Sequence, residues 1–194
     1  MKTLILTFTF LLLAILTFAQ SSEHLSFKGV PINGTLEEYV SKMKQAGFTL
    51  LSSENETAFL NGDFAGYKSC NVSVSTLKQK DLVFKIDVIF PECETWSTLS
   101  GNYFELKQML TEKYGKPLEI MENFGSSSSI PSDDNSKMYY AKVDRCKYHS
   151  TWATEKGEIK LSIDHDDITS CFVRLIYIDK INNAIIKEKA KGDL

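Results

Sequence analysis

Hydrophobic and polar positions repeat along the chain with two different periods, and the longer, helical period comes first. Over residues 36–46 the apolar positions recur every three or four residues, which is the spacing of one helix face. Thr35 and Glu38 have the spacing of a capping box at the start of this stretch, and Gly47 is the left-handed residue expected at its end. We therefore predict a helix whose apolar face consists of Leu36, Tyr39, Val40 and Met43.

The same period predicts a second helix near the middle of the chain. This helix begins at Ser97 or Ser100, and Gly115 and Pro117 are the stop signals that close it. Its apolar stripe consists of Tyr103 or Phe104, Leu106, Met109 or Leu110, and Tyr114. A third, short helix is expected at residues 182–191, where alanine and lysine are frequent.

Alternation with a period of two predicts a β-hairpin between these helices. Val72 and Val74 alternate with serines, and Ile86 and Val88 occupy every second position of the next strand. A serine-rich stretch at residues 125–136 is expected to be an exposed loop. Further strands are expected at residues 48–51, 57–60, 118–121, 138–153, 158–164 and 170–178.

The order of these elements is helix, strands, helix, strands, which predicts the α+β fold class. We expect two tandem units of a helix followed by antiparallel strands, with the helices packed on one face of the sheet. The units would comprise residues 20–96 and 97–194, and one continuous domain is the alternative. The interval from Cys70 to Cys93 nearly equals that from Cys146 to Cys171, which supports a repeat.

The first residues have the order of a secretory signal: a charge, an apolar run and then small residues. Lys2 supplies the charge, residues 4–18 form the apolar run, and Ala19 precedes Gln20 at a small-residue cleavage site. We predict that residues 1–19 are a signal peptide and that the protein is periplasmic or secreted. No later segment is apolar enough to cross a bilayer, so no membrane span is expected after signal removal.

The charge balance argues against a nucleic-acid partner. The formal net charge is −3, and loss of Lys2 with the signal makes it −4, whereas phosphate recognition needs a basic face. The chain contains no phosphate-binding glycine pattern and no G-x-S-x-G motif. We therefore predict no cofactor and name no catalytic residue.

Four cysteines in an exported chain favour disulfides over zinc or reactive thiols. If the apolar residues of each hairpin share a face, Cys70 lies opposite Phe90 and Cys146 lies opposite Asp167. The preferred bridges are Cys70–Cys93 and Cys146–Cys171, and both require the chain to fold back after the hairpin. Cys70–Cys171 and Cys93–Cys146 are the alternatives.

One cluster of potential metal ligands stands out: Asp164, His165, Asp166 and Asp167. Aspartates beside a histidine can bind a divalent cation, and His149 on the neighbouring strand could approach His165. A solvated turn rich in aspartate is the alternative interpretation, and it is favoured because no calcium-loop or HExxH spacing accompanies the cluster.

Two short motifs resemble exported proteins of unknown function from Bacteroides-type bacteria. The first is HLSFKGVPINGTLEEY at residues 24–39, continuing to Gly47 and Phe48. The second covers residues 103–117 and ends in KYGKP, and the Ala19–Gln20 end of the signal is similar too. The motifs cover about a quarter of the chain and imply no activity.

At the level of architecture, tandem units of a helix and an antiparallel sheet with one disulfide each resemble the beta-lactamase inhibitory protein. The small outer-membrane assembly lipoprotein BamE has a related single unit. This resemblance implies a concave sheet surface that grips another protein. A lipid-anchoring cysteine after the signal and an inhibitory loop have no counterpart in this sequence.

We therefore expect an exported, non-catalytic binding protein whose partner is another envelope or extracellular protein. The exposed sheet face and the loop at residues 126–136 would form its binding surface. Four aromatic residues expected in one strand support this, although core packing explains at least half of them: Tyr139, Tyr140, Tyr148 and Trp152. The alternatives are a hydrolase or metal-dependent enzyme using His149, His165 and nearby aspartates, and a structural envelope protein.

Overall fold

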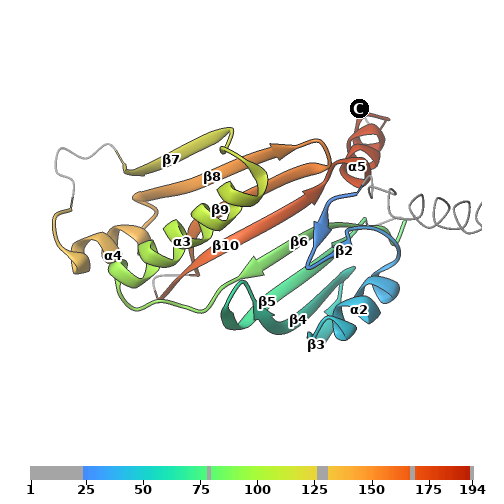
Figure 1. The fold of residues 1–194 in the computed structure, drawn as a ribbon, viewed down its shortest axis with the longest axis horizontal. Helices are drawn as coiled ribbons and strands as arrows, with labels where there is room; N and C mark the ends of the chain where they lie inside the picture. The colour runs from blue at the N-terminus through green and yellow to red at the C-terminus, as the bar shows by residue number, and fades with distance from the viewer. Residues whose placement is uncertain (1–23, 78–79, 126–130, 167–168, 193–194) are drawn as a thin grey trace, which may run out of the picture.

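A sheet of eight antiparallel strands carries helices against one of its faces (Figure 1). The computed structural model describes residues 24–77, 80–125, 131–166 and 169–192. The expected signal peptide, its cleavage site between Ala19 and Gln20, and Asp167 lie outside the described residues. The predicted α+β class with helices packed against an antiparallel sheet is confirmed.

The strand order is β3-β4-β5-β6-β10-β9-β8-β7, so β6 and β10 join the first four strands to the last four. These strands are β3 (Thr49–Glu54), β4 (Thr57–Phe64), β5 (Tyr67–Thr76), β6 (Val83–Ile89), β7 (Glu119–Phe124), β8 (Cys146–Thr154), β9 (Gly157–Asp166) and β10 (Ser170–Asp179). A separate short pair consists of β1 (Ser26–Phe27) and β2 (Val30–Pro31). The helices are α2 (Leu36–Gln45), α3 (Trp96–Tyr114), α4 (Asp134–Lys142) and α5 (Lys180–Gly192).

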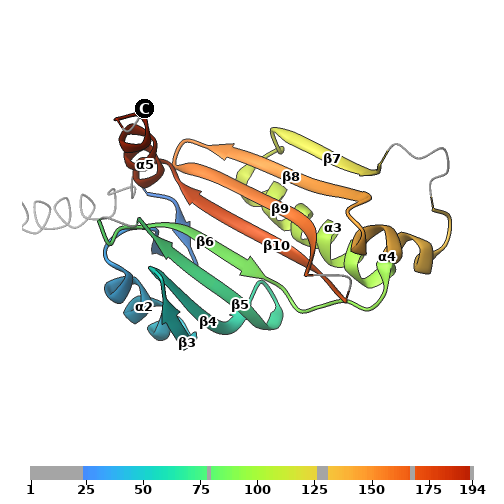
Figure 2. The same cartoon turned by 180° about the vertical axis from the view of Figure 1, so that it is seen from behind.

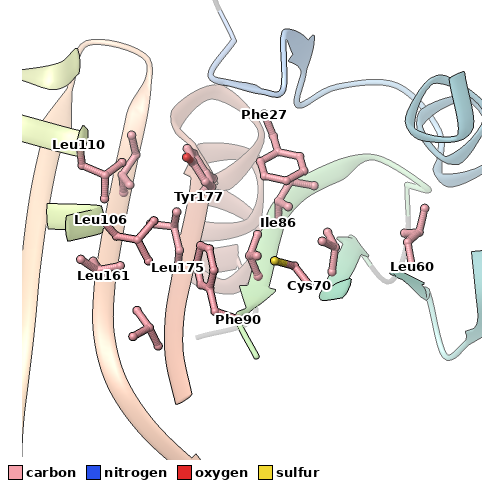
Figure 3. Packing of buried hydrophobic residues seen from close by; sticks show 14 of the residues in the cluster. Phe27, Leu60, Cys70, Ile86, Phe90, Leu106, Leu110, Leu161, Leu175 and Tyr177 are labelled. Carbon is pink, nitrogen blue, oxygen red and sulfur yellow. The ribbon is translucent and has the colours of Figure 1, made fainter. Parts of the chain in front are cut away.

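The core lies between the sheet and the helices, and the strand register builds it. A row of directly paired residues runs across the sheet and is at most 1 % exposed: Leu60, Val72, Val88, Leu175, Leu161 and Ser150. Leu106 and Leu110 of α3 pack on this face beside Leu161 (Figure 3). Because side chains alternate along a strand, the residues directly before and after each member of this row point to the opposite face of the sheet.

Helices α2 and α3 begin and end where local chemistry places them. Thr35 and Glu38 form the predicted capping box of α2, and Gly47 follows with φ +94°. Thr95 caps α3, one residue before its start at Trp96, and Gly115 ends it with φ +84°. No helix in the described part of the chain is long and apolar enough to cross a membrane.

The expected strand over residues 138–153 is wrong at its start, because α4 occupies residues 134–142. Asp133 caps this helix by accepting a hydrogen bond from the Ser136 amide (2.9 Å), and Met138 and Ala141 are buried one turn apart. The helix also begins inside the stretch expected to be a loop. Residues 126–130 of that stretch lie outside the described residues.

The register of the second hairpin also differs from the prediction. Trp152 pairs with Ile159, and Thr154 pairs with Gly157 across a turn of only two residues. Continued to Cys146, this register points to residue 165 and not to residue 167. In the first hairpin Asn71 pairs with Ile89, which agrees with the predicted register.

Two buried tyrosines allow a matched stability test of hydroxyl groups. Within the described part of the chain, the Tyr39 hydroxyl has no hydrogen-bond partner, although its side chain is fully buried. The Tyr103 hydroxyl, equally buried, bonds with Ser150 Oγ at 2.8 Å and donates to Glu122 Oε1 at 3.1 Å.

We expect Tyr39→Phe to leave the free energy of unfolding unchanged or raise it by up to about 1 kcal/mol, because an unpartnered polar group leaves the core. Tyr103→Phe should lower it by about 1–2 kcal/mol, because two partners lose their bond. Urea denaturation of both variants gives the comparison. Equal losses in the two variants would contradict the assignment of the Tyr39 hydroxyl as unpartnered.

Candidate functional site

The sheet face opposite the helices is the candidate functional surface, and we call it the open face. Figure 2 looks onto it, with the strands in front and α3 behind them. Two rows of directly paired residues run across it. The first row is Phe59, Ser73, Asp87, Ile176, Lys160, Thr151 and Glu119. The second row is Asn61, Asn71, Ile89, Arg174, Ser162, His149 and Met121.

The two halves of the open face differ in chemistry. On β4 and β5 it presents short hydroxyl and amide side chains around one aromatic ring, that of Phe59, which is 41 % exposed. On the other half it carries charged and aliphatic residues, and Met121 at the β7 edge is 40 % exposed. The short polar side chains on β4 and β5 leave that half of the open face flat, so a partner can approach these two strands closely.

An ion-pair row lies at the centre of the open face and spans three strands. Arg174 of β10 donates from Nε and Nη2 to both carboxylate oxygens of Asp87 on β6, at 2.9 and 2.6 Å. Its Nη1 donates to Asp164 Oδ2 on β9 at 3.1 Å, and Lys85 Nζ lies 3.7 Å from Asp87. The hydrogen bonds that Arg174 donates to Asp87 raise the pKa of the guanidinium, so this side chain is a fixed positive charge.

Asp164 and His165 of the predicted metal-ligand cluster do not form one site, because their side chains point to opposite faces of β9 and contact different residues. Asp164 belongs to the open face, where Arg174 binds it. His165 lies 3.3 Å from Asp144 (Nε2 to Oδ1), and it pairs with Cys171 on the side of the sheet that faces the helices. His149 is directed to Glu119, with Nε2 and Oε1 3.6 Å apart.

These residues share one small pocket of about 170 Å³ where β8 and β9 separate, lined by Asp144, Cys146, His149, Asp164 and His165. Within residues 24–77, 80–125, 131–166 and 169–192, no three His, Cys, Asp or Glu side chains converge where they could hold a metal ion. Asp164 instead pairs with Arg174, and each of the two histidines lies beside a carboxylate. Asp166, at the end of β9, pairs with Ser170, and Asp167 lies outside the described residues.

All four cysteines are buried and are separate thiols in this structure, and the predicted pairs are not brought together. The chain does not fold back toward Cys70 after Phe90. It continues along β10, so that Cys93 pairs with Cys171. Cys146 belongs to β8, and β9 lies between this strand and β10. Burial raises the pKa of all four thiols, to about 12 for Cys146, which disfavours a reactive thiolate.

The aromatic residues expected in one strand are divided between a helix and a strand. Tyr139 and Tyr140 belong to α4, where Tyr139 is 59 % exposed. Tyr148 and Trp152 belong to β8 and point to the core side, and Trp152 Nε1 donates to the Gly115 carbonyl at 3.0 Å. They therefore do not form part of the open face.

Sequence reasoning missed the residues at the centre of the open face, Asp87 and Arg174. The available signal was a charge inside an otherwise apolar strand: Lys85 and Asp87 alternate with apolar residues in β6, and Arg174 interrupts the apolar run of β10. Their pairing depends on contact between β6 and β10, strands separated by more than 80 positions.

The chain was compared with known proteins at three levels. No protein-family model, curated protein or solved structure matches it.

Proposed function

We propose that this chain is an exported, non-catalytic binding protein that receives another envelope or extracellular protein on its open face. The observation that carries the proposal is an eight-stranded sheet with helices against one face only (Figure 2). The other face carries partly exposed anchors, Phe59 and Met121. The proposed resemblance to the beta-lactamase inhibitory protein implies the same use of a sheet.

The size of the open face supports a protein as the partner. Seven spacings of about 4.8 Å make the sheet about 34 Å wide, and a strand of seven residues spans about 23 Å. The product, about 800 Å², equals what one partner contributes to a standard protein–protein interface. The pocket between β8 and β9, at about 170 Å³, is smaller than the 300–1,000 Å³ usual for small-ligand sites.

The side-chain chemistry of the open face supports the same conclusion. Charges of both signs neutralise one another in the ion-pair row, so this surface is not built for a polyanion. Phe59 and Met121 lie toward opposite edges, and each offers an apolar anchor of the kind that dominates binding energy. Ser73 and Asn71 offer hydrogen bonds between them without bulk.

The chain offers a matched control for testing this face. Phe59 and Met121 are 41 % and 40 % exposed on the open face, and Phe104 and Met109 are 46 % and 41 % exposed on α3. We therefore compare F59D/M121D with F104D/M109D as bait proteins. Both variants replace one phenylalanine and one methionine of similar exposure.

We expect the wild type and F104D/M109D to retain the same protein from periplasmic and extracellular fractions of the source organism. F59D/M121D should lose it by at least about tenfold, because charges in a buried anchor position oppose association. Circular dichroism must show that both variants are folded. A wild type that retains no partner, or equal retention by both variants, would overturn the proposal.

A further inference from the structure

Two cysteines that are distant in sequence face each other across the seam between β6 and β10. Beyond the end of β6 the chain continues beside β10, and the Phe90 amide donates to the Val173 carbonyl at 3.0 Å. Cys93 then forms an antiparallel bridge with Cys171, and its amide donates to the Cys171 carbonyl at 2.8 Å. The backbone therefore places the two residues directly opposite each other.

Directly opposite residues in antiparallel strands have Cα atoms about 4.5–5.5 Å apart, and their side chains project to the same face. Disulfides need Cα atoms about 4.4–6.8 Å apart. Both side chains also lie in the same core cluster, at 6 % exposure for Cys93 and 0 % for Cys171. The strand pairing thus brings the two Cα atoms into the range that a disulfide needs, with the two residues present as separate thiols in the structure.

The other pairings conflict with the sheet order. Cys146 and Cys171 belong to β8 and β10, and the intervening β9 places them about 9–10 Å apart, beyond disulfide range. Cys70 belongs to β5, which β6 separates from β10. Cys70 and Cys93 share no strand pairing, because Cys93 lies beyond the end of β6 and bonds to β10.

We propose that Cys93 and Cys171 form one disulfide across this seam, and that Cys70 and Cys146 stay reduced. The oxidant is a disulfide: oxidised glutathione in solution, or a thiol–disulfide oxidoreductase in an export compartment. The thiolate of one cysteine attacks a sulfur of that disulfide and expels the first oxidant thiolate. The second cysteine then attacks the mixed disulfide, the Cys93–Cys171 bond forms, and two electrons and two protons end on the oxidant thiols.

The burial of both sulfurs determines when this reaction takes place. An oxidant cannot reach a thiol that is buried between α3 and the sheet. Burial also raises the pKa of the Cys93 and Cys171 thiols. The disulfide should therefore form during folding, before the helices pack over the core. For the same reason, the finished bond should resist reductant until the protein is denatured.

Peptide mapping without reduction tests the pairing on the unaltered chain. The purified protein is refolded from denaturant in mixed oxidised and reduced glutathione, blocked with N-ethylmaleimide under denaturing conditions, and digested. We expect one linked peptide pair joining Cys93 to Cys171, with maleimide on Cys70 and Cys146. A Cys70–Cys93 or Cys146–Cys171 link, or four maleimide-labelled cysteines, would overturn the proposal.

Thermal unfolding supplies an independent readout. The bond closes a loop of about 80 residues, so reduction in denaturant followed by refolding should lower Tm by on the order of 10 °C. C70A/C146A should show the same dependence on oxidation, whereas C93A/C171A should show none. An oxidation-dependent Tm in C93A/C171A would contradict the assignment, even if C70A/C146A fails to fold.

Discussion

Replacing Asp179 with alanine is expected to lower the free energy of unfolding by about 3–5 kcal/mol, the largest loss for a single substitution proposed for this chain. Asp179 ends β10 with a fully buried carboxylate. That carboxylate accepts hydrogen bonds from the amides of Leu25 and Asn182, both at 2.9 Å. His24 Nδ1 lies 3.1 Å from the same group.

Asp179 therefore joins the N-terminal segment to the start of α5. Its removal leaves two buried amides without an acceptor. Asn182 depends on the same arrangement, because its Nδ2 donates to the carbonyls of Val83 (2.7 Å) and Ile32 (3.1 Å). The loss of Asp179 thus loosens contacts at both ends of the described chain.

Thermal and urea denaturation measure this effect, and Asp63→Ala is the control. Asp63 pairs with the cation Lys68, but both side chains are more than half exposed, so the midpoint should hardly change. Asp179→Asn should fall between them, because a carboxamide keeps the shape but has one acceptor oxygen. Equal effects of Asp179→Ala and Asp63→Ala would mean that the buried network contributes nothing.

The second large effect is expected at Arg174. Arg174→Ala should lower the free energy of unfolding by about 2–3 kcal/mol, because it leaves the nearly buried carboxylate of Asp87 without its bidentate partner. Two features hold the loss below that of a fully buried pair. The Arg174 side chain is 34 % exposed, and Lys85 remains 3.7 Å from Asp87.

A double-mutant cycle isolates this interaction. D87A added to R174A should cost less than D87A alone, with a coupling energy of about 1–3 kcal/mol, because the orphaned carboxylate is removed. Asp164→Ala should have a smaller effect, since Asp164 is more exposed and makes one bond to Arg174. Additive losses for D87A and R174A would show that the pair carries no net interaction.

Elements whose signals are local were predictable from the sequence. The capping box of Thr35 and Glu38, the alternation around Val72, and the stop at Gly115 each depend on neighbours within a few positions. In contrast, the sequence predicts a loop and then a strand where α4 lies, because serines favour loops and Tyr139 and Tyr140 favour strands. The Asp133 cap and the spacing of Met138 and Ala141 were the helical signals.

Features that depend on strand order were not predictable in the same way. The pairing of β6 with β10 decides that Arg174 meets Asp87 and that Cys93 meets Cys171. When the pairing of β6 with β10 is unknown, each cysteine is most simply paired with the nearest cysteine along the chain. The predicted register of the second hairpin differs from the observed register by two residues, because alternation alone does not fix the length of the turn.

The central claim, that the open face receives a protein partner, is tested most directly by site-specific photocrosslinking. p-Benzoylphenylalanine replaces Phe59 on the open face or Phe104 on α3, and the variants are irradiated in cells of the source organism. Both positions are phenylalanines of similar exposure, so the probe differs only in the surface that it samples.

We predict that the probe at position 59 yields one crosslinked product, which is heavier than the protein alone. The probe at position 104 should yield no such product. Both variants must accumulate to equal levels, which immunoblotting verifies. Crosslinks from position 104 alone, or none from either position, would contradict a partner-binding role of the open face.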